Sequence, residues 1–600
     1  MTGRRADAGE ARPDSGKVRL ERAGGAAHDS AAPPDELAVW APRAGRVELV
    51  VGGRRTPMRR DSGGWARAPR PPAGTDYGIS LDAGEPLPDP RSAFQPAGPH
   101  GPSRVVDHAA FGWTDAGWPG IALPDLIIYE LHVGTFIPGG TFDAAIGRLD
   151  DLVALGVTAI ELLPVAEFPG ERGWGYDGVA LYAPQHTYGG PDGLRRLVDA
   201  AHARGLAVIL DVVYNHLGPD GNHLAKFGPY FTDTYATPWG EAMNFDGPDS
   251  DSVRAHFIDN AVFWLERYHI DGLRLDAVHA IHDRSAVHIL EELALRVAAI
   301  TTGPRRFLIA ESDLNDPRVV TPHERGGHGI DAQWSDDLHH AIHALLTGER
   351  DGYYADFGSA DDLAKALRQA FVHDGRYSSF RRRRHGRAFT GLSGHRFLGY
   401  SQDHDQVGNR ARGERLVHLA GPAKARIAAA LVLLAPFIPL LFQGEEWAAS
   451  TPFQYFTDHH AALGRLVRDG RRHEFAAFGW DPGAIPDPQD PATFERSRLR
   501  WEERALPEHA AMLAWYRDLI ALRRSEPALR DGDLAAVRIE HAPDGRFLLG
   551  RGPITLAVNL GTDELRLAAP GAVVLASGAR LEPDALVLPP LAAAVLRGPA

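Results

Sequence analysis

The stretch Gly272-Leu273-Arg274-Leu275-Asp276 decides how the rest of this sequence is interpreted. It predicts a short buried strand that ends in a carboxylate, with an arginine two residues earlier. Side chains at i and i+2 of a strand point the same way, so Arg274 and Asp276 are expected to form a charge-assisted contact on one face. The cation would keep Asp276 ionised, as a nucleophile requires. Taken alone, the pair is better explained as a structural ion pair that closes the strand.

Apolar strands alternate with stretches of helical period through the middle of the chain. Together with 272–276, the predicted strands are 126–131, 159–163, 207–213, 307–311, 329–334, 397–401 and 438–442. Each is followed by at least one helical stretch, such as 142–155 or 194–203. About eight βα units over several hundred residues predict an α/β fold of the TIM (β/α)8 barrel type. An open, doubly wound sheet is the alternative, but no Gly-rich nucleotide-binding turn follows the first strand.

A chain of 600 residues is expected to contain several domains. Residues 1–35 are rich in Ala, Gly, Asp and Arg, lack the apolar core of a signal peptide, and predict a disordered tail. Short strand-like segments with Gly and Pro turns predict an N-terminal β-sandwich domain over 36–90. A Pro-rich linker over 91–125 leads into the catalytic barrel, 126–529, and short strands return in a small C-terminal β domain over 530–600.

Composition and charge limit the classes of partner. The chain is 44% hydrophobic and 24% charged, as in soluble globular proteins, and has a net charge of −14. That charge disfavours nucleic acid or an anionic membrane as a partner, and no apolar run approaches the roughly 20 residues of a membrane span. The absence of cysteine excludes disulfides and thiol chemistry. We therefore expect a cytoplasmic protein that binds neither nucleic acid nor membrane.

Polar residues occur where the predicted strands end. In a barrel of this kind, catalytic groups lie at the C-terminal ends of the strands and on the loops that follow. Residues 211–216 close one strand, Arg274 and Asp276 another, Glu311 the next, and His404-Asp405 a later one. Apolar residues precede Glu311, so desolvation would raise its pKa and suit it to general acid catalysis. One ionised and one protonated carboxyl group are the pair that glycoside hydrolysis needs.

The segments 211–216, 272–276, Glu311 and His404-Asp405 resemble the four signature regions of the α-amylase superfamily, in the same order. The resemblance implies that Asp276 is the nucleophile, Glu311 the acid/base, and Asp405 the residue that holds sugar hydroxyls and stabilises the transition state. It also implies substrate contacts by Tyr176, as a sugar-stacking platform, and by Asp211, His216, Arg274 and His404. The sequence departs from the superfamily at Asp403, where asparagine is usual, and the added charge is expected to raise a pKa beside Asp405.

Further segments narrow the resemblance to the maltooligosyltrehalose trehalohydrolase family: 87–92, 129–136, 333–340, 406–410 and 451–459. That family hydrolyses the α-1,4 bond next to a terminal trehalose of maltooligosyltrehalose, releasing trehalose and a maltooligosaccharide. The resemblance also implies a pathway link to a maltooligosyltrehalose synthase, and we expect no cofactor and no metal ion. The remaining substrate contacts that it implies are Asp177, His279, Trp334, Asp336, Asp337, His339, His340, Gln406 and Asn409.

Two other functions stay open at this point. α-Glucan branching enzymes share the superfamily and the same three carboxyl groups, because water and a sugar hydroxyl compete for one glycosyl-enzyme intermediate. A non-catalytic glucan-binding protein of the same fold is the second alternative, which the intact Asp276, Glu311 and Asp405 disfavour. If the protein is a retaining hydrolase, the carboxyl groups of Asp276 and Glu311 are expected to lie roughly 5–5.5 Å apart.

Overall fold

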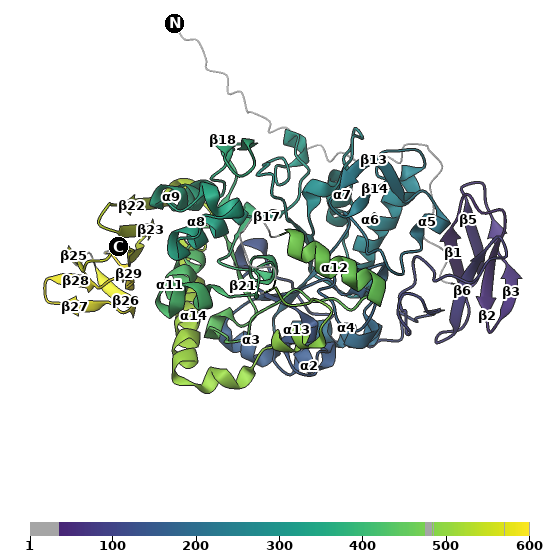
Figure 1. Cartoon of the computed structure of the whole chain (residues 1–600), viewed down its shortest axis with the longest axis horizontal. Helices are drawn as coiled ribbons and strands as arrows, with labels where there is room; N and C mark the ends of the chain where they lie inside the picture. The colour runs from purple at the N-terminus through teal and green to yellow at the C-terminus, as the bar shows by residue number, and fades with distance from the viewer. Residues whose placement is uncertain (1–34, 475–482, 484, 569–570, 599–600) are drawn as a thin grey trace, which may run out of the picture.

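The chain folds into a barrel with a β-sheet domain at each end (Figure 1). The computed structural model describes residues 35–474, 483, 485–568 and 571–598. The predicted N-terminal tail lies outside the described residues, apart from Asp35. The N-terminal sheets, drawn in purple, and the C-terminal sheets, drawn in yellow, lie at opposite ends of the long axis of the molecule.

Within the described residues, eight parallel strands close into one barrel, and β21 pairs back onto β8. Each predicted barrel strand is confirmed, and the TIM-barrel prediction with them. In spatial order the strands are β8 (Ile128–Leu131), β9 (Ala159–Leu162), β12 (Ala207–Val212), β15 (Gly272–Leu275), β16 (Phe307–Ala310), β17 (Ala332–Trp334), β20 (Phe397–Gly399) and β21 (Ile438–Phe442). The register places Arg274 beside Asp211 on one side and Ile309 on the other.

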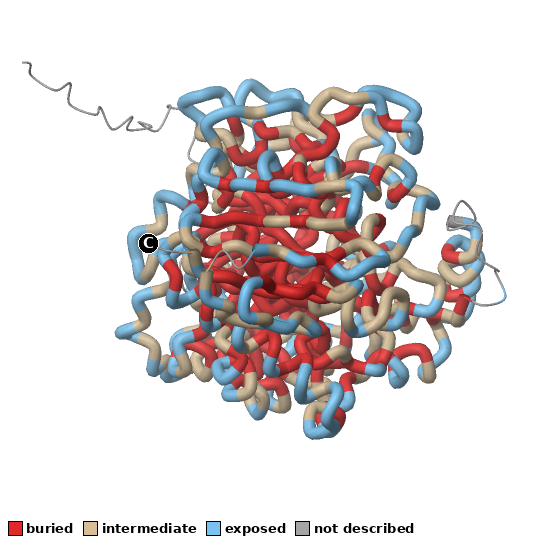
Figure 2. The backbone as a smooth tube through the Cα atoms, turned by 90° about the vertical axis from the view of Figure 1, so that its left-hand side faces the viewer, coloured by how far each residue is buried: buried red, intermediate tan, exposed pale blue. Residues whose placement is uncertain are grey.

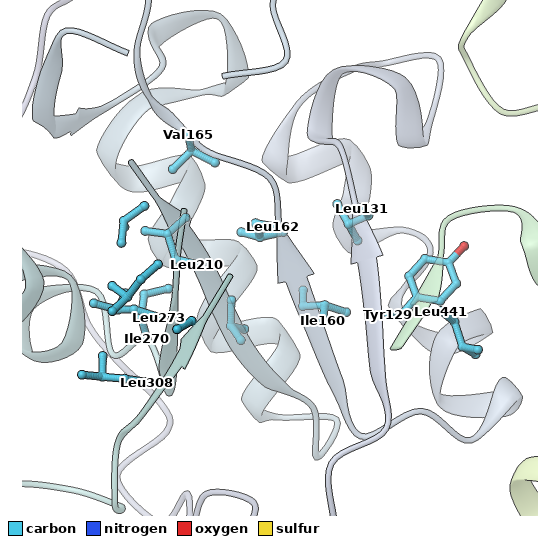
Figure 3. Packing of buried hydrophobic residues seen from close by; sticks show 14 of the residues in the cluster. Tyr129, Leu131, Ile160, Leu162, Val165, Leu210, Ile270, Leu273, Leu308 and Leu441 are labelled. Atoms are coloured by element: carbon cyan, nitrogen blue, oxygen red, sulfur yellow. The ribbon is translucent and has the colours of Figure 1, made fainter. Parts of the chain in front are cut away.

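Side chains of the barrel strands alternate between the inside and the outside of the barrel. Inward apolar side chains such as Ile128, Ile209 and Leu440 form one buried cluster. Outward side chains such as Tyr129 and Leu210 belong to a larger cluster that includes helix residues (Figure 3). Both layers are buried, and Figure 2 shows them as the red interior of the backbone tube. Strands covered on both faces appear in the sequence as continuous apolar runs.

The α-helices of the described residues pack against the outside of the barrel strands or lie in the loops between them. They are α1 (Val133–Phe136), α2 (Phe142–Ile146), α3 (Leu149–Leu155), α4 (Gly190–His202), α5 (Leu224–Phe227), α6 (Ser250–Arg267), α7 (Ile289–Ala298), α8 (Asp336–Thr347), α9 (Ala360–Gln369), α10 (His404–Gly408), α11 (Leu416–Leu433), α12 (Ala461–Glu474), α13 (Pro491–Arg496) and α14 (Pro507–Ser525). One predicted helical stretch is wrong. Between β16 and β17 the chain forms only a 3-10 turn, His323–Arg325, because Pro317, Pro322 and three glycines at 326, 327 and 329 disfavour an α-helix there.

Additional strands extend the loops of the barrel. Three antiparallel pairs occur in the described residues: β10 (Ala166–Glu167) with β11 (Ala180–Pro184), β13 (Phe231–Thr237) with β14 (Gly240–Met243), and β18 (Asp374–Ser378) with β19 (Arg383–Gly386). All three follow barrel strands in the chain. The first two lie between a barrel strand and the following helix α4 or α6, so they belong to loops at the C-terminal ends of the strands. The third comes after α8 and α9, and Arg381 in its turn contacts Asp313 in the loop after β16.

The two flanking domains consist of antiparallel sheets. The N-terminal sheets are β1 (Glu36–Trp40), β5 (Trp65–Pro69) and β4 (Arg59–Arg60), and β3 (Arg54–Pro57), β2 (Val47–Val51), β6 (Asp76–Leu81) and β7 (Ser103–Arg104). The strand β7 comes from the predicted linker and pairs with β6. The C-terminal sheets are β22 (Val537–His541), β23 (Arg546–Arg551), β24 (Ile554–Asn559), β29 (Ala593–Arg597) and β26 (Ala572–Ser577), and β25 (Leu565–Ala568), β28 (Ala585–Leu588) and β27 (Arg580–Glu582).

Helix α11 is, among the described residues, the one helix long and apolar enough to cross a membrane. Half of that stretch is buried inside the protein. Its backbone leaves the helical conformation at Gly421, immediately before Pro422, so it consists of two shorter helices. Because α11 packs against α8 and α14, core packing explains its apolar composition.

Candidate active site

Arg274 lies at the centre of the polar cluster at the C-terminal rim of the barrel. Its buried guanidinium donates from Nη1 to Oδ2 of Asp211 over 2.7 Å and to Oδ1 of Asp276 over 2.8 Å. Its Nη2 donates to Oε2 of Glu311 over 2.7 Å. The ring of Trp334 lies 4.4 Å from the guanidinium carbon, in cation–π contact. Carboxyl groups from the ends of β12, β15 and β16 thus converge on one cation.

Asp276 is held in the ionised state. Burial by itself would raise its pKa, but the charges of Arg274 and His216 and the hydrogen bonds from Asn215 and Arg274 hold that pKa below its ordinary value. Nδ2 of Asn215 donates to Oδ2 of Asp276 over 2.7 Å and to its backbone oxygen over 2.8 Å. Each carboxylate oxygen therefore has one fixed donor, and the group is oriented as well as charged.

Glu311, in contrast to Asp276, is placed so that its protonated form is favoured. Desolvation raises its pKa well above the ordinary value; Arg274 opposes the rise, and the charges of Asp276 and Asp405 add to it. Oε2 accepts from Arg274 and, over 2.8 Å, from the backbone N–H of Ala277. Since Oε2 already faces two donors, the proton of the neutral acid belongs on Oε1. Ala277 has a φ of 40°, a strained left-handed conformation for a residue with a Cβ.

Tyr176, His404 and Asp211 form a second contact group beside Arg274. The Tyr176 hydroxyl donates to Oδ2 of Asp211 over 2.6 Å and lies 2.7 Å from Nε2 of His404. The rings of Tyr176 and His404 are stacked, with 5.1 Å between centroids. Burial raises the pKa of Asp211 to about 6, with Arg274 opposing. The Tyr176 hydroxyl therefore links Asp211 to His404 and holds the stacked rings in place.

Asp405 is the most exposed carboxyl group of the cluster, with 39% of its side chain accessible against 17% for Glu311. It follows His404 on α10, and its Oδ1 lies 3.6 Å from Nε2 of that histidine. Nδ2 of Asn409, one turn later, donates to Oδ1 of Asp405 over 3.1 Å. Asp405 thus faces the open side of the site. Asp403 caps the helix through the backbone N–H of Gln406, and burial raises the pKa of Asp403 itself.

Comparison with known proteins identifies the family of enzymes to which the chain belongs. The family "Alpha amylase, catalytic domain" matches residues 102–232. A malto-oligosyltrehalose trehalohydrolase from Arthrobacter ramosus is 52% identical over 550 residues, which are 90% of this chain and 95% of the relative. The chain belongs to the malto-oligosyltrehalose trehalohydrolase family.

Two further comparisons place this trehalohydrolase-family chain among related enzymes. The crystal structure of a putative alpha amylase from Salmonella typhimurium is 39% identical, with a TM-score of 0.87 over 94% of this chain and 97% of that one. A 1,4-alpha-glucan branching enzyme, GlgB, from Pseudoalteromonas atlantica is 31% identical over 363 residues, which are 52% of this chain and 49% of the relative. The predicted resemblance to the trehalohydrolase family is confirmed.

The other residues that the trehalohydrolase resemblance singled out divide by burial. Those with partly exposed side chains, able to touch a ligand as they stand, are Tyr176, Asp177, His279, Asp336, Gln406 and Asn409. Asp336 accepts a hydrogen bond from the Tyr400 hydroxyl, and burial raises its pKa to about 7, with that bond opposing. Asp177 faces His459, whose Nε2 lies 3.3 Å from its Oδ2. His216 is buried, and its Nε2 lies 3.0 Å from the backbone oxygen of Tyr176.

The predicted contacts Asp337, His339 and His340 are enclosed in the protein. Oδ2 of Asp337 accepts from Nδ2 of Asn315 and from the backbone N–H groups of Val372 and His373, over 2.6–2.8 Å. Both ring nitrogens of His339 have partners, the Ser401 carbonyl at 2.7 Å and the Tyr354 hydroxyl at 3.0 Å. His340 packs beside the rings of Tyr353 and Phe357. Asp337 and His339 thus hydrogen-bond to neighbouring loops, and the contact of all three side chains with substrate stays a prediction.

Three residues of the site were not among the predicted contacts. Asn215 orients Asp276, Glu130 contacts His404, and Trp239 stacks on His216 at 4.5 Å while 48% of it stays exposed. A signal existed for Glu130, since it is the one charged residue within the apolar segment 126–131. Trp239 lies between β13 and β14, and no pattern in the sequence connects that turn with the barrel rim.

Proposed function

We propose that this protein is a retaining glycoside hydrolase that cleaves the α-1,4 bond next to the terminal trehalose of maltooligosyltrehalose, releasing trehalose and a maltooligosaccharide. The observation that carries the proposal is the position of Arg274 between Asp276 and Glu311 in a chain of this family. It supplies one ionised and one protonated carboxyl group on the same guanidinium, and retaining glycoside hydrolysis needs that pair.

In the first step, a carboxylate oxygen of Asp276 attacks the anomeric carbon of the maltooligosyl unit. The bond from that carbon to the trehalose O4 breaks, and the proton on Oε1 of Glu311 passes to the departing oxygen. Trehalose leaves as a neutral alcohol, and the maltooligosyl unit stays on Asp276 as a β-linked ester. The cost of removing Glu311 from water raises its pKa and so favours the protonated form that this step needs.

In the second step, the ionised Glu311 takes a proton from water while the water oxygen attacks the anomeric carbon. The ester bond to Asp276 breaks, and the product recovers the α configuration after two inversions. Arg274 remains in contact with both carboxyl groups, so the negative charge lies beside its guanidinium whichever of the two groups is ionised. Asp405 and the stacked pair of Tyr176 and His404 hold the sugar at the reacting centre.

Maltotriosyltrehalose, maltopentaose and amylose, each incubated with the purified protein, provide the test. Rapid release of trehalose from the first, with little attack on the other two, is the expected result. Amylose cleavage or branching without trehalose release would keep the barrel and its carboxyl groups but reject the substrate. No turnover of any of the three would favour the glucan-binding alternative.

We also propose a pathway partner and a location for the enzyme. Its substrate would be the product of a maltooligosyltrehalose synthase, which makes that enzyme the pathway partner. A cysteine-free chain with a net charge of −14 is consistent with a cytoplasmic location and with no nucleic acid or membrane partner.

A further inference from the structure

Glu130, on the barrel strand β8, forms two hydrogen bonds with His404. Its Oε1 is 2.6 Å from Nδ1 of His404, and its Oε2 accepts from the His404 backbone N–H over 3.0 Å. Both side chains are 1% exposed. A buried carboxylate with both oxygens on one residue fixes the ring and the backbone of that residue together.

The hydrogen bonds on the other side of the ring define which atoms carry protons. Burial raises the pKa of Tyr176 well above its ordinary value, so its hydroxyl keeps its proton and donates it to Oδ2 of Asp211. The Tyr176 oxygen then accepts from Nε2 of His404, 2.7 Å away. On the far side, Nδ1 donates to Glu130. Both ring nitrogens therefore carry a proton, and the ring is an imidazolium.

The charged groups that face His404 favour that cation. Glu130 approaches from β8, Asp403 and Asp405 flank it on its own segment, and Asp211 approaches through Tyr176. The opposing cation in the same cluster is Arg274, whereas burial lowers the pKa of His132 to about 4 and leaves that ring neutral at neutral pH. Burial opposes the charged form of His404, but Glu130 first, and then Asp405 and Asp403, raise its pKa to about 10.

We propose that Glu130 is a positioning residue that keeps His404 doubly protonated and aligned, so that a charged N–H holds Tyr176 in place at the reacting centre. The inference rests on the proposed function for its effect on rate, but not for the protonation state itself. Glu130 does not reach the open site and acts only through His404. His404 has both ring nitrogens occupied and is 1% exposed, so it acts through the partly exposed Tyr176, which its charged N–H holds more firmly than a neutral ring would.

Glu161 provides a matched control in the same layer of the barrel. It pairs in register with Glu130 on the adjacent strand and is equally buried, at 1%. Neither of its carboxyl oxygens has a hydrogen-bond partner within the described residues. Burial, with the nearby Glu130 adding to it, raises the pKa of Glu161 well above the ordinary value, so the group is neutral. Its replacement by glutamine changes neither charge nor hydrogen bonding to His404.

Glu130→Gln isolates the charge because its amide can replace the carboxylate atom for atom. The amide oxygen accepts from the His404 backbone N–H, and the amide NH₂ donates to an unprotonated Nδ1. The ring then keeps a proton on Nε2 for Tyr176 and is neutral. The experiment compares wild type, Glu130→Gln and Glu161→Gln, each as the full chain labelled with ¹⁵N-histidine. The His404 signals are assigned by their loss in His404→Asn.

The expected NMR result is an imidazolium at His404 through neutral pH in wild type and Glu161→Gln, and a neutral ring in Glu130→Gln. With maltotriosyltrehalose, Glu130→Gln should lose about tenfold or more in kcat, below the ~10²–10³ that removal of a whole donor costs. The alkaline limb of the pH profile of kcat for Glu130→Gln should move to lower pH, with KM little changed. Glu161→Gln should keep the wild-type rate and profile.

Three results would overturn the inference. They are a neutral His404 in wild type at neutral pH, an imidazolium that persists in Glu130→Gln, and equal effects of the two glutamine variants. If Glu130→Gln does not fold, the wild-type titration still decides the protonation state. If trehalose is not released at all, the proposed function fails, while the NMR comparison continues to test Glu130.

Discussion

Nη2 of Arg274 donates to Oε2 of Glu311 over 2.7 Å, and that contact determines where the acid keeps its proton. An oxygen that accepts from a guanidinium and from the Ala277 N–H does not also carry a proton, which leaves Oε1. The same guanidinium holds the nucleophile Asp276 through Nη1. One arginine therefore fixes the orientation of both reacting groups while their pKa values are moved in opposite directions.

Glu311→Gln should lower kcat on maltotriosyltrehalose by ~10²–10⁴, the usual contribution of general acid–base catalysis, with little change in KM. Azide together with α-maltotriosyl fluoride should restore turnover, because fluoride leaves without a proton and azide attacks without a base. The product to measure is the α-glycosyl azide, because azide displaces the β-linked ester on Asp276 with inversion. Asp276→Asn is the control: without its nucleophile, azide can react only by direct displacement of fluoride, which gives the β-glycosyl azide. α-Azide from Asp276→Asn and β-azide from Glu311→Gln would reverse the two assignments.

The pH profile of kcat/KM should be bell-shaped. The pKa of Asp276 is lowered, so the nucleophile is lost only as pH falls below its ordinary value of 3.8. The pKa of Glu311 is raised, so the acid is lost as pH rises through a value well above 4.5. Between these limits both groups are in the required state. An alkaline limb that stays unchanged in the fluoride reaction of Glu311→Gln would assign that limb to another group.

The substitution Glu311→Gln should affect stability in the opposite direction from activity. A carboxyl group with a raised pKa binds its proton more tightly in the folded state, so its stabilisation is complete below pH 4.5 and is lost as pH rises through the folded pKa. Glutamine resembles the protonated form. Glu311→Gln should therefore melt at a higher temperature than wild type in mildly alkaline buffer, with the difference vanishing at acid pH. A lower melting temperature at both pH values would contradict the burial argument.

Arg274→Lys should abolish most activity and destabilise the fold by about 3–5 kcal/mol, the cost of leaving a buried ion pair uncompensated. Lysine keeps the charge but cannot donate in the fork geometry to Asp211, Asp276 and Glu311 together. Chemical denaturation measures the loss. Arg305→Lys is the matched control, because that side chain is 84% exposed in its pair with Asp331 and should change stability by less than ~1 kcal/mol.

The sequence predicts those parts of this structure that depend on short-range patterns. Apolar runs locate the barrel strands, and the i, i+2 spacing places Arg274 on the same face as Asp276. The contact between Glu130 and His404 joins residues 274 positions apart, so it depends on closure of the barrel and no local pattern contains it. The partners of Asp337 are likewise absent from any local pattern, because backbone N–H groups from a distant loop contact its carboxylate; its contact with substrate stays a prediction.

Asp337→Ala should mainly cost stability, about 3 kcal/mol, because it leaves the buried N–H groups of Val372 and His373 without an acceptor and removes one of the two acceptors of the Asn315 amide. Asp336→Asn is the comparison: its side chain is partly exposed, so it should change KM or kcat with little effect on stability. Melting temperatures and kinetics of the two variants distinguish a residue that stabilises the fold from one that contacts the substrate. A raised KM in Asp337→Ala without destabilisation would return that residue to the substrate pocket.

Gly408→Ala tests how far the packing below the site controls catalysis. A Cβ at this position, three residues after Asp405, would lie 2.1 Å from the ring of Trp174. That ring has little freedom: it is buried, donates from Nε1 to the Gln454 carbonyl over 2.9 Å, and contacts the His404 ring at 5.6 Å. The alanine should therefore displace Trp174 and with it His404, costing about 1–3 kcal/mol of stability.

Activity of Gly408→Ala should fall by about tenfold or more although the residue touches no substrate, because a small displacement of positioning groups is costly. Gly470→Ala is the matched control. Its Cβ would meet nothing within 4 Å, and it lies inside helix α12, where alanine is favoured over glycine by about 1 kcal/mol. Gly470→Ala should keep wild-type kinetics and melt at an equal or higher temperature. Wild-type kinetics in Gly408→Ala would show that the His404 side of the site tolerates displacement, and that Arg274 alone sets the geometry of the reacting carboxyl groups.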